Sequence, residues 1–328
     1  MIKKGIIKYT GIALTSLLIA GAISCRKAPT NTSTSGIATI VCDASFENIM
    51  DQEIDVFEYN TKGKASIIPY YESEKACIDS LLDFKTKLIV ITRDLNEKEK
   101  EYIKAKNRNV RSNRIAVDAI ALIVNPDNPI EQLSVSEIAD ILTGKTTEWS
   151  QLGPGMLKGD IQVVFDNEGS STVQYMRDSV MNGEKFADNV FAQNTNQEVF
   201  TQVQNRKNAI GIIGVSWISA DMRTRDLPRE ERIKSLNQQD TTVSEFDTSV
   251  KVLKVSGKDD FRAYKPYQGY IYDGSYPLHR SMYMISTAAN GSLSHGFYSF
   301  VTGTIGQKII QRTGILPARV QPRMVNLN

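Results

Sequence analysis

The sequence has few of the residues from which metal and redox sites are built. Its 328 residues include three cysteines and two histidines, His279 and His295, and without a cluster of these residue types a zinc site is not expected. The formal net charge of +2 excludes the basic surface typical of nucleic-acid-binding proteins. Beyond the N-terminal region no run of 18 apolar residues offers a membrane span. The hydrophobic content of 41% is ordinary for a globular protein, and the length suffices for two domains.

Residues 1–25 are predicted to form a signal peptide. Lys3 and Lys4 precede an apolar stretch at 12–23, and small residues follow it. The sequence AISC at 22–25 resembles a bacterial lipobox, in which Cys25 is diacylated and becomes the new N-terminus. The acyl chains would anchor the protein, since each buried methylene contributes about 0.8 kcal/mol, and residues 26–36 would form a flexible polar tether. Simple secretion with cleavage nearby is the alternative.

The other two cysteines, Cys42 and Cys77, allow two interpretations. Outside the cytoplasm they are able to pair, but their spacing alone does not establish a disulfide. We favour two buried free thiols and keep the disulfide as the alternative. A lone histidine is more often structural than catalytic, so neither histidine is a catalytic candidate.

Strand-like and helix-like segments alternate along the chain. Ser45 is a good N-cap, and Phe46, Met50, Ile54 and Phe57 follow it at helical spacing. Strands are expected at 38–43, 65–71, 87–92 and 161–165, charged or capped helices at 96–106 and 134–144, long apolar segments at 116–126 and 208–219, and a closing helix at 297–314. This alternation predicts an α/β fold with a mostly parallel sheet.

Polar loops follow several of the predicted strands where a helix begins, at 43–46, 71–75, 92–95 and 168–172. Free N–H groups and the helix dipole favour an anion at such points, and ligands of open α/β sheets bind beyond the carboxyl ends of the strands. Taken singly, each loop has a plainer explanation, such as an N-cap worth about 1 kcal/mol, a turn glycine, or a surface ion pair of an arginine. Their joint occurrence predicts an anion site that needs no metal.

Four longer motifs carry a resemblance to a known family. They are AVDAIALIVNPDNPIEQLSVSEIADILTGKTTEWSQLG at 116–153, NAIGIIG at 208–214, YPLHRSMYM at 276–284 and GQKIIQRTGILP at 306–317. In this order, over about residues 38–317, the chain resembles the PstS-type phosphate-binding lipoproteins, the periplasmic substrate-binding proteins of phosphate ABC transporters.

The resemblance implies a fold and a function. The fold would be the two-lobed, type II periplasmic-binding-protein clamshell, with lobe one at 37–116 plus 219–328, lobe two at 117–218, and two crossing segments between them. The protein would capture inorganic phosphate in the interlobe cleft and deliver it to an ABC permease. It would act as a monomer, without enzymatic activity or a cofactor. A lipid anchor alone would hold it on the periplasmic or cell-surface side of a bacterial membrane, and no nucleic acid would be a partner.

The resemblance also implies which residues bind the anion. They lie in the polar loops and are Ser45, Phe46, Ser73, Thr92, Arg93, Gly169, Ser170, Ser171 and Thr172. The match around Ser73 is loose, and Ser171 replaces a glycine of the family's GSGT loop.

Two departures from the family pattern affect the charge of the predicted site. Some members place an arginine three residues before the loop glycine or just after its threonine, where this chain has Asp166 and Val173. Arg93 is therefore the main candidate cation. Glu74 and Glu168 bring carboxylates, which either accept the proton of HPO4 and so discriminate against sulfate, or repel the anion.

Three other functions are weighed against phosphate transport. The same cleft would suit another tetrahedral oxyanion or a phosphorylated small molecule. A sensor or adhesin that kept the fold is a further alternative, because function depends on the site and not on the fold. A hydrolase using Ser170 or Ser171 is the least favoured, since it needs a base beside the nucleophile and NEGSSTV is not a nucleophile elbow.

Overall fold

The computed structural model describes residues 31–219, 228, 230–231, 246–258 and 260–319. Its strands are β1 (Gly36–Asp43), β2 (Ala65–Glu72), β3 (Leu88–Ile91), β4 (Arg111–Val124), β5 (Gln132–Ser134), β6 (Gln162–Phe165), β7 (Val190–Ala192), β8 (Ala209–Gly214), β9 (Lys251–Val252), β10 (Lys254–Ser256), β11 (Ala263–Tyr264), β12 (His279–Ser286) and β13 (Leu316–Pro317). Its α-helices are α2 (Glu47–Asn60), α3 (Glu74–Leu82), α4 (Glu97–Ala105), α5 (Val135–Leu142), α6 (Ser171–Tyr175), α7 (Asn196–Asn205), α9 (Gln268–Tyr272), α10 (Leu293–Val301) and α11 (Thr304–Arg312). Short 3-10 turns are η2 (Ala44–Phe46), η3 (Trp149–Leu152) and η5 (Val215–Trp217), and η4 (Met176–Val180) is a π-helical turn.

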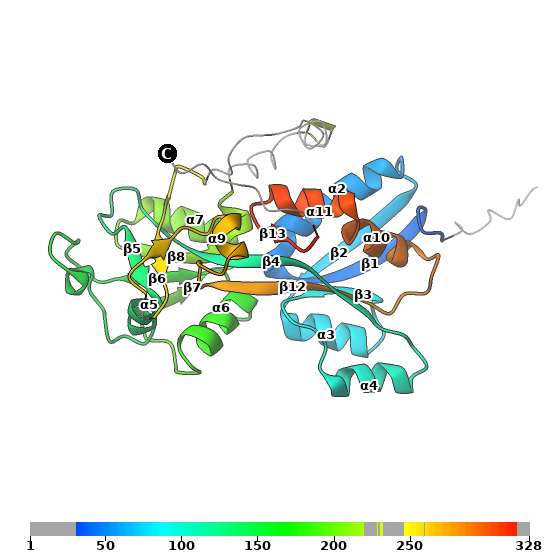
Figure 1. Cartoon of the computed structure of the whole chain (residues 1–328), viewed down its shortest axis with the longest axis horizontal. Helices are drawn as coiled ribbons and strands as arrows, with labels where there is room; N and C mark the ends of the chain where they lie inside the picture. The colour runs from blue at the N-terminus through cyan, green and yellow to red at the C-terminus, as the bar shows by residue number, and fades with distance from the viewer. Residues whose placement is uncertain (1–30, 220–227, 229, 232–245, 259, 320–328) are drawn as a thin grey trace, which may run out of the picture.

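A 10-stranded sheet is the framework of the described chain. Strands β2, β1, β3, β12, β4, β8, β6 and β7 lie side by side in that order, and β9 and β13 also pair with β4. Figure 1 shows helices along both sides of this sheet, with β4 and β12 running lengthwise through the middle. The predicted α/β class is confirmed, but the sheet is mixed and not mostly parallel, because β4 and β12 run antiparallel to their neighbours. The predicted signal peptide, with Cys25, lies outside the described residues, and no helix within them is long and apolar enough to cross a membrane.

One half of the sheet brings together three of the four loops predicted to bind an anion, and the fourth, at 168–172, follows β6 in the other half. Strand β1 lies between β2 and β3 and is parallel to both, and β12 runs antiparallel to β3. Every residue of β3 is buried, as expected for a strand with helices on both faces. Because the three parallel strands end at the same edge of the sheet, the polar loops that follow them converge there.

Strand β4 connects this half of the sheet to the other. Its first part pairs with β12 and its last part, 120–124, pairs antiparallel with β8, while β6 lies parallel to both β8 and β7. Strands β9 and β10 pair with β4 and β5, so the chain at 251–256 lies beside segments predicted to belong to lobe two. We therefore propose that lobe two comprises 117–218 together with about 251–264, and that the remaining described residues after 264 return to lobe one.

Two local predictions differ from the structure. Ser45 is not the N-cap of α2: its backbone N–H donates to the Asp43 side chain, and Phe46 occupies the cap position without a side-chain bond. The closing helix predicted at 297–314 is two helices, α10 and α11, which join at Gly303. A Cβ at Gly306 would lie 2.5 Å from the Cα of Val301, so a glycine is required where α11 folds back against α10. The two cysteines, by contrast, are buried free thiols, as favoured from the sequence.

Candidate functional site

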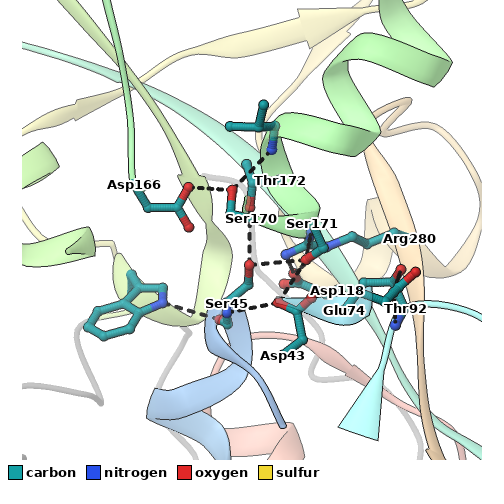
Figure 2. A network of polar contacts seen from close by, with 12 residues as sticks. Asp43, Ser45, Glu74, Thr92, Asp118, Asp166, Ser170, Ser171, Thr172 and Arg280 are labelled. Atoms are coloured by element: carbon teal, nitrogen blue, oxygen red, sulfur yellow. Dashed lines mark hydrogen bonds and ion pairs between the residues drawn. The ribbon is translucent and has the colours of Figure 1, made fainter. Parts of the chain in front are cut away.

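Hydroxyl groups from both halves of the molecule meet at the end of β1. Asp43, the last residue of β1, accepts hydrogen bonds at Oδ1 from the backbone N–H of Ser45 and the hydroxyl of Ser171, each at 2.9 Å. The hydroxyl of Ser45 lies 3.1 Å from that of Ser171 and 3.5 Å from that of Thr172. Because Ser45 does not cap a helix, its side chain is available for this contact. The four side chains are buried and form a cluster that we call the base of the site (Figure 2).

A buried arginine completes the base. Arg280 on β12 pairs in register with Asp118 on β4, and its Nε and one terminal nitrogen donate to Asp118 Oδ2 at 3.2 and 3.1 Å. Its other terminal nitrogen donates to the Ser171 hydroxyl at 2.7 Å, and its guanidinium lies over the Phe46 ring, 5.1 Å from the centroid. The arginine side chain is 4% exposed, so its charge acts in a dehydrated environment.

Sequence reasoning missed Arg280. The residue lies within YPLHRSMYM, one of the motifs that carried the family resemblance, but no role was assigned to it. The signal was its place in the strand alternation: Arg280 lies on the same face as Met282 and Met284, and an arginine is rarely fully buried unless it is paired.

Three buried aspartates surround this cation. Asp43, Asp118 and Asp166 are each at most 2% exposed, and each has one carboxylate oxygen without a hydrogen-bond partner. Burial raises the pKa of Asp43 to about 6, although Arg280 and the donors on the serines act in the opposite direction. Burial likewise raises the pKa of Asp118 and of Asp166. These unpaired oxygens are buried acceptors, which are costly without a donor, and none of the three aspartates is among the residues that line the cleft described below.

The loop before α6 is held by one of these aspartates. Ser170 accepts from the backbone N–H of Val173 as the N-cap of α6 and donates to Asp166 Oδ1 at 2.6 Å. A Cβ at Gly169 would lie 3.7 Å from the Cβ of Ser73, an ordinary contact. The glycine is therefore not needed for the close approach of these two loops. Glu168, the other acidic residue of this loop, is exposed.

The remaining predicted residues form the opposite side of the site, which we call the rim. Ser73 caps α3, and the Glu74 carboxylate accepts from both the backbone N–H and the hydroxyl of Thr92. Arg93 donates two hydrogen bonds to the Glu99 carboxylate at 2.8 and 2.9 Å, and these bonds raise the pKa of Arg93 and lower that of Glu99. The Arg93 side chain is 41% exposed, so the predicted main cation lies at the surface and is already paired.

The base and the rim border a single cleft of about 910 Å3. Of the predicted residues, Ser73, Thr92, Arg93, Gly169, Ser170 and Ser171 line it, together with Arg280. Ser45, Phe46 and Thr172 are not among its lining residues, and they are buried behind it. Within the described ranges, no group of His, Cys, Asp and Glu side chains is arranged to hold a metal ion. The cleft is therefore suited to a small polar or anionic ligand bound by side-chain donors.

Comparison with known proteins identifies similar chains. A family model described as the PBP superfamily domain matches residues 27–304. The phosphate-binding protein PstS of Pseudomonas aeruginosa is 26% identical over 230 residues, which cover 64% of this chain and 62% of that protein. PstS of Staphylococcus saprophyticus is 24% identical over 224 residues, 66% of this chain and 60% of its own length. The chain thus spans about six tenths of the length of these curated relatives.

Solved structures show the same fold. A protein from Clostridium perfringens, crystallised with bound phosphate, superposes with a TM-score of 0.67 at 24% identity, covering 87% of this chain and 100% of its own. An ABC-type phosphate transport receptor from Vibrio cholerae superposes with a TM-score of 0.61 at 20% identity, covering 86% of this chain and 100% of its own.

Proposed function

Because the chain belongs to the PBP superfamily domain family, we propose that it is a substrate-binding protein that captures inorganic phosphate in the cleft and delivers it to an ABC permease. The names of its relatives, phosphate-binding proteins, support this ligand. The observation that carries the proposal is the buried guanidinium of Arg280, which donates to the Ser171 hydroxyl where both halves of the molecule meet. A charge-assisted donor in a dehydrated cleft suits an anion.

The base offers both donors and acceptors to a phosphate ion. Arg280 would donate to oxygens without a proton, and the hydroxyls of Ser170 and Ser171 would do so in place of their bonds to Asp166 and Asp43. Asp43 does not line the cleft, but it contacts Ser171, and its unpaired oxygen would accept a proton that the ligand carries once that hydroxyl turns to the ligand. Phosphate is protonated near neutral pH and sulfate is not, so sulfate would leave this acceptor unsatisfied. Discrimination of this kind, by an unpaired buried group, is much stronger than discrimination by size. We assign the acceptor role to Asp43 because Glu74 is already engaged by Thr92.

The contacts of the two candidate nucleophiles support binding over hydrolysis. The hydroxyls of Ser170 and Ser171 donate to Asp166 and Asp43, and these carboxylates lie within networks that also hold the backbone. His279 contacts the carbonyl of Tyr276 instead. In this interpretation the hydroxyls form hydrogen bonds to the ligand and do not attack it, as expected of a receptor.

We propose that the protein lies outside the cytoplasm, anchored through Cys25, because residues 22–25 resemble a lipobox. Membrane fractionation tests the anchor: the parent chain should sediment with membranes and the Cys25→Ser variant should be released.

Titration calorimetry of the full chain, freed of bound anion by dialysis, tests the ligand. Phosphate should bind with micromolar or tighter affinity and sulfate should give no heat. The Arg280→Lys variant keeps the charge but not the planar fork, and should lose about 2 kcal/mol of binding free energy. Arg206→Lys, at an exposed arginine that bonds to Gln162, is the matched control and should bind as the parent does. Equal binding of sulfate would remove Asp43 from its assigned role, and silence toward both anions would overturn the proposed function.

A further inference from the structure

The cleft is much larger than an inorganic phosphate ion requires. Its volume is about 910 Å3, whereas an anion of five heavy atoms displaces about as much as three waters, on the order of 90 Å3. Clefts for organic ligands measure roughly 300–1,000 Å3. Direct contacts already join the two halves at the base, including the bond from the Trp217 ring nitrogen to the carbonyl of Ser45 at 3.3 Å. Of the base residues, Ser171 and Arg280 line the cleft, so most of its lining lies beyond the base.

The outer part of the cleft has two walls of different elements. Helix α3 supplies Ile78 and Leu82, and the helix formed by α6 and η4 supplies Gln174, Tyr175 and Asp178. Figure 1 shows α3 and α6 on the same side of the sheet, with the strands β4 and β12 above both. We call these five residues the outer walls.

The outer walls combine apolar surface with polar groups. Ile78 is buried and Tyr175 half-buried, while Gln174 and Asp178 are exposed and joined by a hydrogen bond of 2.5 Å. The wall continues through η4, a π-helical turn, and such turns are rare and occur frequently at functional sites. The same helices also contribute Lys75, Asp79 and Ser179 to the lining. The outer part of the cleft therefore offers many hydrogen-bonding groups beside an apolar and aromatic surface, which suits a small hydroxylated molecule.

We propose that the outer walls form a second subsite, which takes the polyol group of a small phosphomonoester whose phosphate lies at the base. The inference rests on the proposed function, since the base must hold the phosphate group. The C–H faces of the polyol would pack against Ile78 and Tyr175, and its hydroxyls would donate to the Asp178 carboxylate and the Gln174 carbonyl oxygen, both acceptors. Inorganic phosphate would fill the base alone, so the protein accepts both ligands.

Calorimetry of the full chain with glycerol 3-phosphate, inorganic phosphate and glycerol tests the second subsite. Glycerol 3-phosphate should bind at least as tightly as phosphate, and glycerol alone should give no heat. The Leu82→Trp variant should fill the outer cleft and weaken glycerol 3-phosphate by about tenfold or more, while phosphate changes by less than about twofold. Ile68→Trp, on a side chain of β2 that is 41% exposed and outside the cleft, is the matched control and should change neither ligand.

A second variant makes the result independent of the fit of a tryptophan. Asp178→Ala removes an exposed carboxylate that would accept hydrogen bonds from the ligand hydroxyls. The variant should weaken the binding of glycerol 3-phosphate about threefold to tenfold without affecting the binding of phosphate. Binding of phosphate without binding of glycerol 3-phosphate to the parent chain would overturn the second subsite and leave the proposed function standing. Equal losses for both ligands in either variant would also overturn it. Failure of both ligands to bind the parent chain would overturn the proposed function itself.

Discussion

The base and the rim of the cleft each hold an arginine paired with a carboxylate, and the two pairs differ in their exposure to water. The side chains of Arg280 and Asp118 are 4% and 1% exposed, whereas those of Arg93 and Glu99 are 41% and 14% exposed. Both arginines make two hydrogen bonds to their partner. The Arg280 bonds share one oxygen of Asp118, whereas Arg93 bonds to both oxygens of Glu99. The number of bonds is thus the same, but water screens the second pair far more. We therefore propose that burial, and not the number of contacts, determines which arginine dominates the binding of an anion.

The largest effect is expected from removal of the buried cation. Arg280→Met would leave Asp118 as a buried carboxylate without its charge partner, and breaking a buried pair from one side costs roughly 3–5 kcal/mol. Urea unfolding of the ligand-free chain at pH 7.5 measures this loss of unfolding free energy. Arg280→Met combined with Asp118→Leu removes both charges and should recover most of the loss. A single variant as stable as the parent would mean that the pair is hydrated in solution, and the contrast with the rim would disappear.

A second contrast concerns pH. The folded-state pKa of Asp43 is about 6, raised by burial from an ordinary value of 3.8, so the folded protein holds this proton more tightly than the unfolded chain does. Protonated Asp43 contributes about 3 kcal/mol to the unfolding free energy below about pH 4. This contribution is lost as the pH rises to about 6. Glu99 on the rim has a lowered pKa, chiefly through its bonds from Arg93, and so contributes in the opposite sense: its stabilisation is lost as the pH falls.

Asp43→Asn should therefore reduce the decline in unfolding free energy between pH 4 and pH 7 by up to about 3 kcal/mol. Asparagine keeps the carbonyl oxygen that accepts from Ser45 and Ser171. Urea unfolding at several pH values measures the slope of unfolding free energy against pH. Glu99→Gln is the control, and it should instead remove a small loss of unfolding free energy at acid pH. If the slope is unchanged in Asp43→Asn, the Asp43 carboxyl is not the group that titrates at the base.

The contrast between base and rim also separates what the sequence predicts from what it does not. Strands and polar loops depend on neighbouring residues, and their positions followed from local patterns. The rim pair is local too: Asn96 and Glu99 form a capping box at the start of α4, a spacing that is readable in the sequence, and it places Glu99 within reach of Arg93. Arg280 and Asp118 are 162 positions apart, and only the register of β12 against β4 brings them together.

The carboxylates of the base illustrate the same limit. Asp43 ends one predicted strand and Asp166 directly follows another, so their place at the edge of the sheet was predictable. Their burial was not, because it depends on contacts between the halves, such as the bond of Ser171 to Asp43 across 128 positions. The departures from the family pattern at 166 and 173 led to the prediction that Arg93 is the main cation. That prediction left out Arg280, because Arg280 comes from the distant strand β12.

The smallest effect is expected at the rim. Arg93→Met breaks an ion pair that is partly exposed, so the unfolding free energy should fall by less than about 1 kcal/mol. Since Arg93 is held by Glu99, phosphate affinity should fall by less than in Arg280→Lys, by about threefold to fivefold through the lost long-range attraction. Calorimetry at low and high salt measures this loss of phosphate affinity and its dependence on ionic strength, because an exposed charge acts more weakly at high ionic strength. A loss as large as that of Arg280→Lys, and independent of salt, would mean that Arg93 leaves Glu99 and contacts the ligand directly, and the rim would then supply the second cation that the base lacks.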